Sequence, residues 1–267
     1  MEAVAKETDM LMLFEDQNFR GAYREYFIQK RKNFQVVIRD IPELWDCFQK
    51  IDEIWARDLD DMKTTTDRNV PIVIAMFRNS HAQFRIAFEL GFSTAISEAW
   101  AIMRSCIDTG VVAHKLYREP NLIPVWLRKD QGKAEKKAYK AAFETFKEQG
   151  LFPVAYGLSE LYSYYRDYSE WGVHPGVGAI SMHCKIESNG NGQNWDHTYL
   201  ETDPKRLVAF LFTMLKIASL IETTYFNCFD NRLKLDYKLV QMRNEFERAN
   251  QHTAEVIGQI IRNETSQ

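Results

Sequence analysis

Two opposite charges lie one helical turn apart in one of the most apolar stretches of the chain. Arg104 and Asp108 are spaced i and i+4, so on a helix they share a face and can share hydrogen bonds. The surrounding segment, residues 95–117, is apolar on most sides, and a bare charge in such surroundings is costly. The pair therefore indicates either a pocket lined by a guanidinium and a carboxylate or a buried ion pair that ties helices together.

A second group of polar side chains lies on the preceding helical segment. Arg78, His81 and Arg85 recur at steps of three and four residues and fall on one helix face. If this face meets Arg104, it lines a cationic cavity suited to an anion. If it meets water, it is the polar face of an ordinary amphipathic helix. We take the three as candidate ligand-binding residues.

A third group closes a later helix that is rich in aromatic residues. Tyr165 and Ser169 are one turn apart, and His174 follows the expected helix end. An imidazole titrates near neutral pH and can act as a general acid or base. The same histidine can also be a cap without a chemical role. In a shared site, Arg104, Asp108 and His174 would be catalytic, and Tyr165 and Ser169 would contact the ligand.

Metal and cofactor motifs are weak. His183, Cys184, Asp196 and His197 could converge across two strands, but His183 and Cys184 are neighbours and would point to opposite faces of a strand. No HExxH or paired-cysteine motif supports them. No phosphate loop or dinucleotide fingerprint is present either. We therefore expect no metal site and no cofactor.

The composition is that of an ordinary globular protein. The 267 residues carry a formal net charge of −3, with 45% hydrophobic and 27% charged residues. This balance argues against a broad basic surface for nucleic acid, although not against a local one. The four cysteines form no CxxC pair, and the N-terminus lacks a signal-peptide pattern. We expect a cytoplasmic protein with reduced thiols.

The apolar periodicity predicts long helices, because the 12 glycines and 7 prolines are few. We expect an all-α bundle of six to eight helices in a single domain, 1–267. Its parts are a helical pair (1–62), a central bundle (63–230) and a long C-terminal helix (231–267). A turn signal at 188–192 predicts one β-hairpin or flap insertion near 177–202. Within 71–117 we expect two helices, or one bent near Gly91.

Two apolar patterns predict how the last helices are used. The run 207–221 is about 15 residues long, short of the roughly 20 that span a bilayer, so we expect a core helix and no membrane partner. The final helix carries an a/d seam that can pack along the bundle or pair two subunits into a homodimer. Its members are Leu235, Leu239, Met242, Phe246, Ala249, Thr253, Val256 and Ile260.

The order of these features resembles a family of uncharacterised bacterial all-helical proteins, a domain of unknown function. The resemblance rests on Arg104-Ser-Cys-Ile-Asp108 and on Tyr165-x3-Ser169-x4-His174, and covers roughly residues 70–228. The family prefers Glu where this chain has Asp108, which shortens the acid. Because the family has no settled activity, the resemblance implies an architecture more than a reaction.

The same outline is similar to the helical HEPN superfamily, whose RNase members use an Arg-x4–6-His motif on one helix. Here Arg78 and His81 have two residues between them, Arg166 and His174 have seven, and the pair at 248 and 252 has three. None of these spacings fits. The resemblance therefore implies that the standard nuclease site is absent or rebuilt from Arg104 and His174.

Three functions compete on this evidence, and the sequence leaves open whether the protein is an enzyme. We favour a ligand- or partner-binding helical module, acting as a homo-oligomer, that takes a small anionic ligand. The alternative is an RNA- or nucleotide-directed phosphodiesterase of defence or toxin type, in which an arginine binds phosphate and His174 moves a proton. A metal enzyme built on the hairpin is the third.

Overall fold

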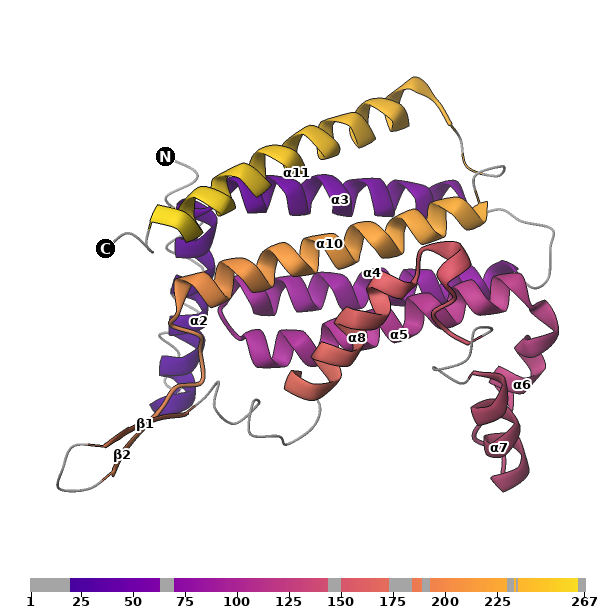
Figure 1. The fold of residues 1–267 in the computed structure, drawn as a ribbon, viewed down its shortest axis with the longest axis horizontal. Coiled ribbons are helices and arrows are strands. Elements are labelled where there is room, and N and C mark those ends of the chain that lie inside the picture. The colour runs from indigo at the N-terminus through magenta and orange to yellow at the C-terminus, as the bar shows by residue number, and fades with distance from the viewer. Residues whose placement is uncertain are drawn as a thin grey trace.

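The computed structural model describes residues 20–62, 70–143, 150–172, 184–188, 193–229, 233 and 235–263. The fold is all-helical, as the sequence predicts (Figure 1). In chain order, the α-helices are α2 (Gly21–Asp40), α3 (Pro42–Asp61), α4 (Val70–Phe92), α5 (Ile96–Arg118), α6 (Ile123–Leu127), α7 (Lys133–Ala142), α8 (Ser159–Gly172), α10 (Pro204–Phe229) and α11 (Tyr237–Asn263). Two short 3₁₀ turns, η1 (Pro120–Leu122) and η2 (Val154–Tyr156), precede α6 and α8.

The described residues thus contain nine α-helices, so the predicted range of six to eight is too low. Prolines account for the extra element. Pro120 opens η1, and Pro124 lies in the first turn of α6, where a proline without an N–H is tolerated. The chain between α5 and α7 is therefore cut into short pieces.

The bend predicted near Gly91 is confirmed, because α4 ends at Phe92 and α5 begins at Ile96. Thr94 lies between them with a φ of 64°, a left-handed conformation that is uncommon for a residue with a side chain. The backbone N–H of Ala95 donates to the carbonyl of Leu90, which closes the turn. The two helices can therefore fold back against each other.

Helix α10 lies in the interior of the bundle and contacts α3, α4, α5, α8 and α11 (Figure 1). It has 26 residues and is the one described helix long and apolar enough to cross a membrane. Within its most apolar window, 61% of the residues are buried inside the protein. Packing against five helices accounts for its apolar composition.

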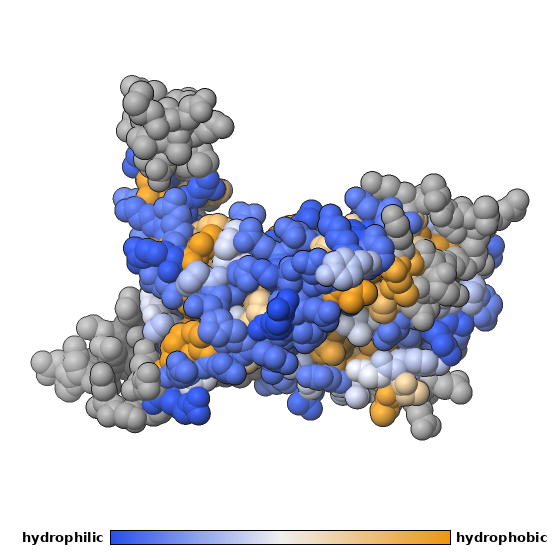
Figure 2. Space-filling view, turned by 90° about the horizontal axis from the view of Figure 1, so that it is seen from above, coloured by the Kyte–Doolittle hydropathy of each residue, from blue (hydrophilic) through white to orange (hydrophobic). Residues whose placement is uncertain are grey.

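Helix α11 lies along α3 of the same chain (Figure 1). Its seam residues Leu239, Phe246 and Thr253 are buried, so much of the a/d pattern is used within one molecule. The hydroxyl of Thr253 donates to the carbonyl of Glu43 at 3.2 Å. The face seen from above is mostly hydrophilic, with separate apolar patches (Figure 2).

Two short strands, β1 (Cys184–Ser188) and β2 (Gln193–His197), pair antiparallel between α8 and α10. Their register pairs Cys184 with His197 and Ser188 with Gln193. The turn signal at 189–192 lies outside the described residues. The pair extends from the lower end of the bundle in Figure 1.

Candidate functional site

Arg104 on α5 is held by two hydroxyl groups from α8. Its Nε donates to Oγ of Ser169 at 2.6 Å, and its Nη2 donates to the phenol oxygen of Tyr165 at 2.8 Å. The guanidinium carbon also lies 4.8 Å from the centre of the Tyr165 ring, within cation–π range. The Ser169 hydroxyl donates to the carbonyl of Tyr165 at 2.7 Å, so the serine itself is fixed. The structure therefore brings three of the predicted site residues together.

Asp108 joins this cluster one turn further along α5. Its Oδ2 lies 3.5 Å from Nη1 of Arg104, which is a loose ion pair. Burial raises the pKa of the Asp108 carboxyl group, and the positive charge of Arg104 only partly opposes that shift. A carboxyl group with a raised pKa can donate a proton or hydrogen bond that an ordinary aspartate cannot.

The Asp108 side chain also lines a cavity of about 740 Å³, which we call the Asp108 pocket. This volume lies within the usual range for small-molecule sites. The described residues that line the pocket are Ile72, Ala75, Met76, Asn79, Gln83, Ser105, Asp108, Thr109, Val112, Trp126, Lys129, Tyr139 and Leu151.

One wall of the Asp108 pocket is a hydrogen-bonded polar surface from α4 and α5. The Gln83 amide donates to the Ser105 hydroxyl at 2.9 Å and accepts from the Thr109 hydroxyl at 3.2 Å. Asn79 lies one turn before Gln83 on the same face of α4. The wall offers amide and hydroxyl groups whose positions are already set.

The opposite wall comes from α6, α7 and the residues between them. Nζ of Lys129 lies 5.7 Å from the Trp126 ring centre and 5.6 Å from that of Tyr139. Burial raises the pKa of Tyr139, and the charges of Asp108 and Asp130 add to the shift. The phenol is therefore close enough to Asp108 to feel its charge. This wall combines one cation with two aromatic rings.

The other predicted basic residues do not reach Arg104. His81 and Arg85 both bind Asp52 on α3, with Nε2 of His81 at 2.7 Å and Nε of Arg85 at 2.6 Å from Oδ1. The buried His81 ring stacks on Trp55 at 5.0 Å. Arg78 is exposed on α4. The predicted cationic cavity between α4 and Arg104 is therefore not formed by these residues. The face of α4 that carries His81 and Arg85 packs against α3 instead.

The pairing with His81 and Arg85 also sets the charge of Asp52. Burial alone would raise the pKa of this carboxyl group. The hydrogen bonds from the imidazole and the guanidinium outweigh that effect and lower the pKa to about 2. The triad fastens α4 to α3.

Of the remaining predicted site residues, Cys184 is a half-buried free cysteine at the start of β1, and the others lie outside what the structure describes. His174 and His183 fall in the undescribed range 173–183, and the side chains of Asp196 and His197 are likewise not described. Among the described residues, no three His, Cys, Asp or Glu side chains form a group that could hold a metal ion.

The structure contains a second buried polar cluster, which the sequence patterns did not predict. Arg243 on α11 donates to Oδ2 of Asp58 at 3.0 Å and to Oε2 of Glu222 at 3.2 Å. Both acids are almost fully buried. Burial raises the pKa of Glu222 to about 8, although Arg243 opposes the shift. This cluster ties α3, α10 and α11 together.

Sequence reasoning also missed the aromatic wall of the Asp108 pocket. Trp126 and Lys129 lie in and just after a five-residue helix, where no periodic pattern indicates which side chains face inward. The proline pair at 120 and 124 is the one signal that marks this segment as an unusual connection. No family model, curated protein or solved structure significantly matches this chain.

Proposed function

We propose that the protein is a ligand-binding module and that the Asp108 pocket takes a small anion that carries a flat ring. The observation that supports this most is the position of Asp108. Its carboxyl group lines the pocket and also contacts Arg104, whose own position is fixed by Tyr165 and Ser169. A cavity with a few precisely placed polar groups in its lining is a common arrangement in binding sites.

The described lining of the pocket carries one acid, Asp108, and one cation, Lys129. Lys129 is the group that favours an anion. Asp108, with its raised pKa, can be protonated at lower cost than an ordinary aspartate when an anion binds beside it. Arg104 is paired mainly with neutral hydroxyl groups, so its charge is only loosely compensated by Asp108. We therefore assign Lys129 and Asp108 to ligand contact and Arg104 to the positioning of Asp108.

The aromatic side chains of the pocket favour a flat ring. Trp126 and Tyr139 present aromatic surfaces, and stacking on such rings contributes about 0.5–1.5 kcal/mol beyond area burial. The side-chain amides of Asn79 and Gln83 can form hydrogen bonds with polar atoms on the edge of the ligand ring. The ligand class is therefore an aromatic phosphate or carboxylate.

Titration calorimetry with phenyl phosphate tests this proposal, and benzylamine serves as a ring of similar size and opposite charge. We expect phenyl phosphate to bind and benzylamine not to bind. Lys129→Ala should weaken phenyl phosphate binding about tenfold or more, because a charge-assisted hydrogen bond contributes about 1.5–3 kcal/mol. Lys136→Ala, which removes an exposed lysine from α7, is the matched control and should bind normally. Equal binding of both probes, or equal effects of both variants, would refute the proposal.

The second candidate function is a phosphodiesterase directed at RNA or nucleotides. It is supported by an acid with a raised pKa beside an arginine that two hydroxyl groups orient. In this reaction Arg104 would bind the phosphate, and His174 would take the proton of the attacking hydroxyl. The phosphorus–oxygen bond to the leaving group would break, and that oxygen would receive a proton from Asp108.

Hydrolysis of bis(4-nitrophenyl) phosphate and of a short RNA measures this second activity. Arg104→Ala and His174→Ala proteins that keep their fold should lose it. If both variants match the wild-type protein, or if the wild-type protein has no activity, this candidate fails.

We also propose that the chain is one cytoplasmic domain in which residues 177–202 form a single flap. We further propose that the protein forms a homodimer through α11. The antiparallel register of β1 and β2 supports the flap. Buried, unpaired Cys47, Cys106 and Cys228 suit a reducing compartment. Exposed Leu235 and Val240 near the start of α11 could pair two copies. Light scattering that shows a strict monomer at high concentration would remove the homodimer.

A further inference from the structure

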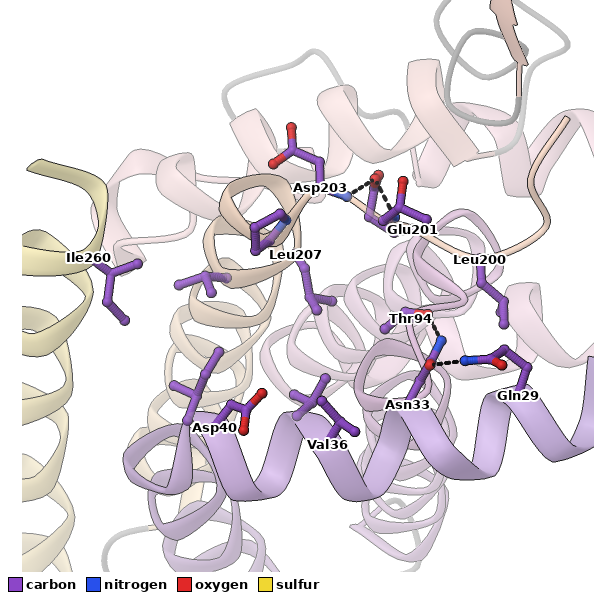
Figure 3. A pocket seen from close by; sticks show the side chains of 15 residues that line it. Gln29, Asn33, Val36, Asp40, Thr94, Leu200, Glu201, Asp203, Leu207 and Ile260 are labelled. Carbon is purple, nitrogen blue, oxygen red and sulfur yellow. Dashed lines mark hydrogen bonds between the residues drawn. The ribbon is translucent and has the colours of Figure 1, made fainter. Parts of the chain in front are cut away.

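A second cavity, of about 540 Å³, lies between α2, the N-terminal end of α10 and the end of α11 (Figure 3). We call it the α2 pocket. It is separate from the Asp108 pocket, with which it shares no lining residue. The described residues that line it are Gln29, Asn33, Val36, Val37, Asp40, Ile41, Thr94, Leu200, Glu201, Thr202, Asp203, Pro204, Leu207, Val208 and Ile260.

A chain of hydrogen bonds fixes one end of the α2 pocket. The Gln29 amide donates to Oδ1 of Asn33, and the Asn33 amide donates to Oγ1 of Thr94, both at 2.7 Å (Figure 3). The backbone N–H of Glu201 donates to the Thr94 carbonyl at 2.8 Å. Thr94 is the buried residue with the left-handed backbone. These bonds tie α2 and the segment before α10 to the turn at Thr94, so this end of the cavity is fixed before a ligand binds.

The middle of the α2 pocket is apolar. Val37 on α2 and Ile41 just after it line the cavity with Leu207 and Val208 of α10, and Ile260 of α11 completes this apolar lining. Such a surface favours an aliphatic or aromatic body, at roughly 25 cal/mol for each Å² of apolar surface removed from water.

The charged side chains in the described lining of the α2 pocket are three carboxylates, Asp40, Glu201 and Asp203. Glu201 accepts the backbone N–H groups of Thr202 and Asp203, and Asp203 accepts that of Lys205 at the start of α10. Glu201 also forms an ion pair with Arg206, with 3.2 Å between Oε2 and Nη1. These two acids therefore already have partners.

Asp40 is the carboxylate that remains available to a ligand. Its side chain rises from α2 towards α10, on the same side as Val36, whereas the Asp203 carboxylate points away from α2 (Figure 3). Its partner is Arg39, in an ion pair in which both side chains are more than half exposed. Exposed pairs of this kind are weak and are readily replaced.

We propose that the α2 pocket binds an organic amine, with the apolar body between α2 and α10 and the ammonium group on Asp40. Two observations support this assignment: the apolar cavity, and the Asp40 carboxylate in its lining, whose ion pair with Arg39 is exposed. A fatty acid would bring its carboxylate close to the negative charge of Asp40. The repulsion between the two charges disfavours binding of a fatty acid.

Octylamine, octanoate and octanol distinguish the possible ligands, because they share one chain and differ in charge. Binding is measured by calorimetry on the full-length protein. We expect octylamine to bind most tightly, octanol more weakly and octanoate least. Asp40→Asn should lower octylamine affinity about threefold to fivefold, because an ion pair on a half-exposed carboxylate is weak, and should leave octanol binding unchanged. Asp46→Asn, at an exposed acid on α3, is the control and should have no effect.

A second variant tests the location independently of charge. Val36 is 40% exposed, so Val36→Trp can fill the cavity without disturbing the core. It should abolish binding of both octylamine and octanol while the circular dichroism spectrum stays that of the wild-type protein. The proposal is overturned if octanoate binds as well as octylamine, if no probe binds, or if Val36→Trp binds normally.

Discussion

The guanidinium of Arg243 reaches across from α11 to the buried carboxyl group of Glu222 on α10, with Nη1 3.2 Å from Oε2. The same arginine donates to Asp58 on α3. Two buried acids thus share one cation, and among the described residues Oδ1 of Asp58 and Nε of Arg243 have no hydrogen-bond partner. Such a cluster favours one retained proton, because two buried negative charges beside one positive charge would be costly.

This relationship predicts a loss of stability as pH rises from acid to mildly alkaline values. The folded-state pKa of Glu222, about 8, is higher than its ordinary value of 4.5. Its protonated form therefore stabilises the folded state fully below pH 4.5, and this contribution is lost as pH rises through about 8. We expect the melting temperature to fall as pH rises from about 4.5 to about 8 and to level off above pH about 8. Glu222→Gln, which cannot ionise, should flatten this decline, and an equal decline in both proteins would contradict the assignment.

The Asp52 triad predicts the opposite behaviour at acid pH. The pKa of Asp52 is lowered to about 2, from 3.8, so its contribution is present above pH 3.8 and is lost as pH falls through about 2. Asp52→Asn should lower the free energy of unfolding at neutral pH by about 1–3 kcal/mol. Denaturant melts of both proteins measure this difference. A gap that persists below pH about 2 would show that the carboxylate is not its cause.

Arg104 should stabilise the contact between α5 and α8. Arg104→Ala removes two hydrogen bonds from a charged donor and should cost about 1–3 kcal/mol of unfolding free energy. The control is Arg166→Ala on α8, because its side chain is 67% exposed. Urea denaturation that gives equal midpoints for the two variants would show that the hydroxyl contacts contribute nothing.

The spacing of charged residues predicted only part of this site. The i, i+4 rule places Arg104 beside Asp108, and the resemblance indicated Tyr165 and Ser169 as companions. The partner of His81 could not be predicted, because helical periodicity shows which side chains share a face and not which helix covers it. Asp52 occupies that face from another helix.

Helical periodicity predicted the helices of the fold better than it predicted which surfaces pair with a second subunit. The bend after Gly91 and the long α10 follow from glycine, proline and apolar spacing. The a/d seam of α11 has the same appearance whether its partner is α3 or a second subunit. In the structure, Leu239 and Phe246 of the seam are buried within one chain.

Protonation of Asp108 should control ligand affinity in the proposed anion site. Because its pKa is raised, we expect phenyl phosphate to bind more weakly as pH rises and the carboxyl group ionises. Asp108→Asn should remove much of this dependence and should retain affinity at the higher pH. Calorimetry at several pH values compares the two proteins. A steeper pH dependence in the variant would place the titrating group elsewhere.

A crystal structure of the protein with phenyl phosphate tests the central claim most directly. The account predicts that the ring lies against Trp126 and Tyr139, with the phosphate oxygens within hydrogen-bond distance of Lys129 and Asp108. Phosphate bound instead at a site that does not touch Asp108, or an Asp108 pocket that stays empty at saturating ligand, would contradict it.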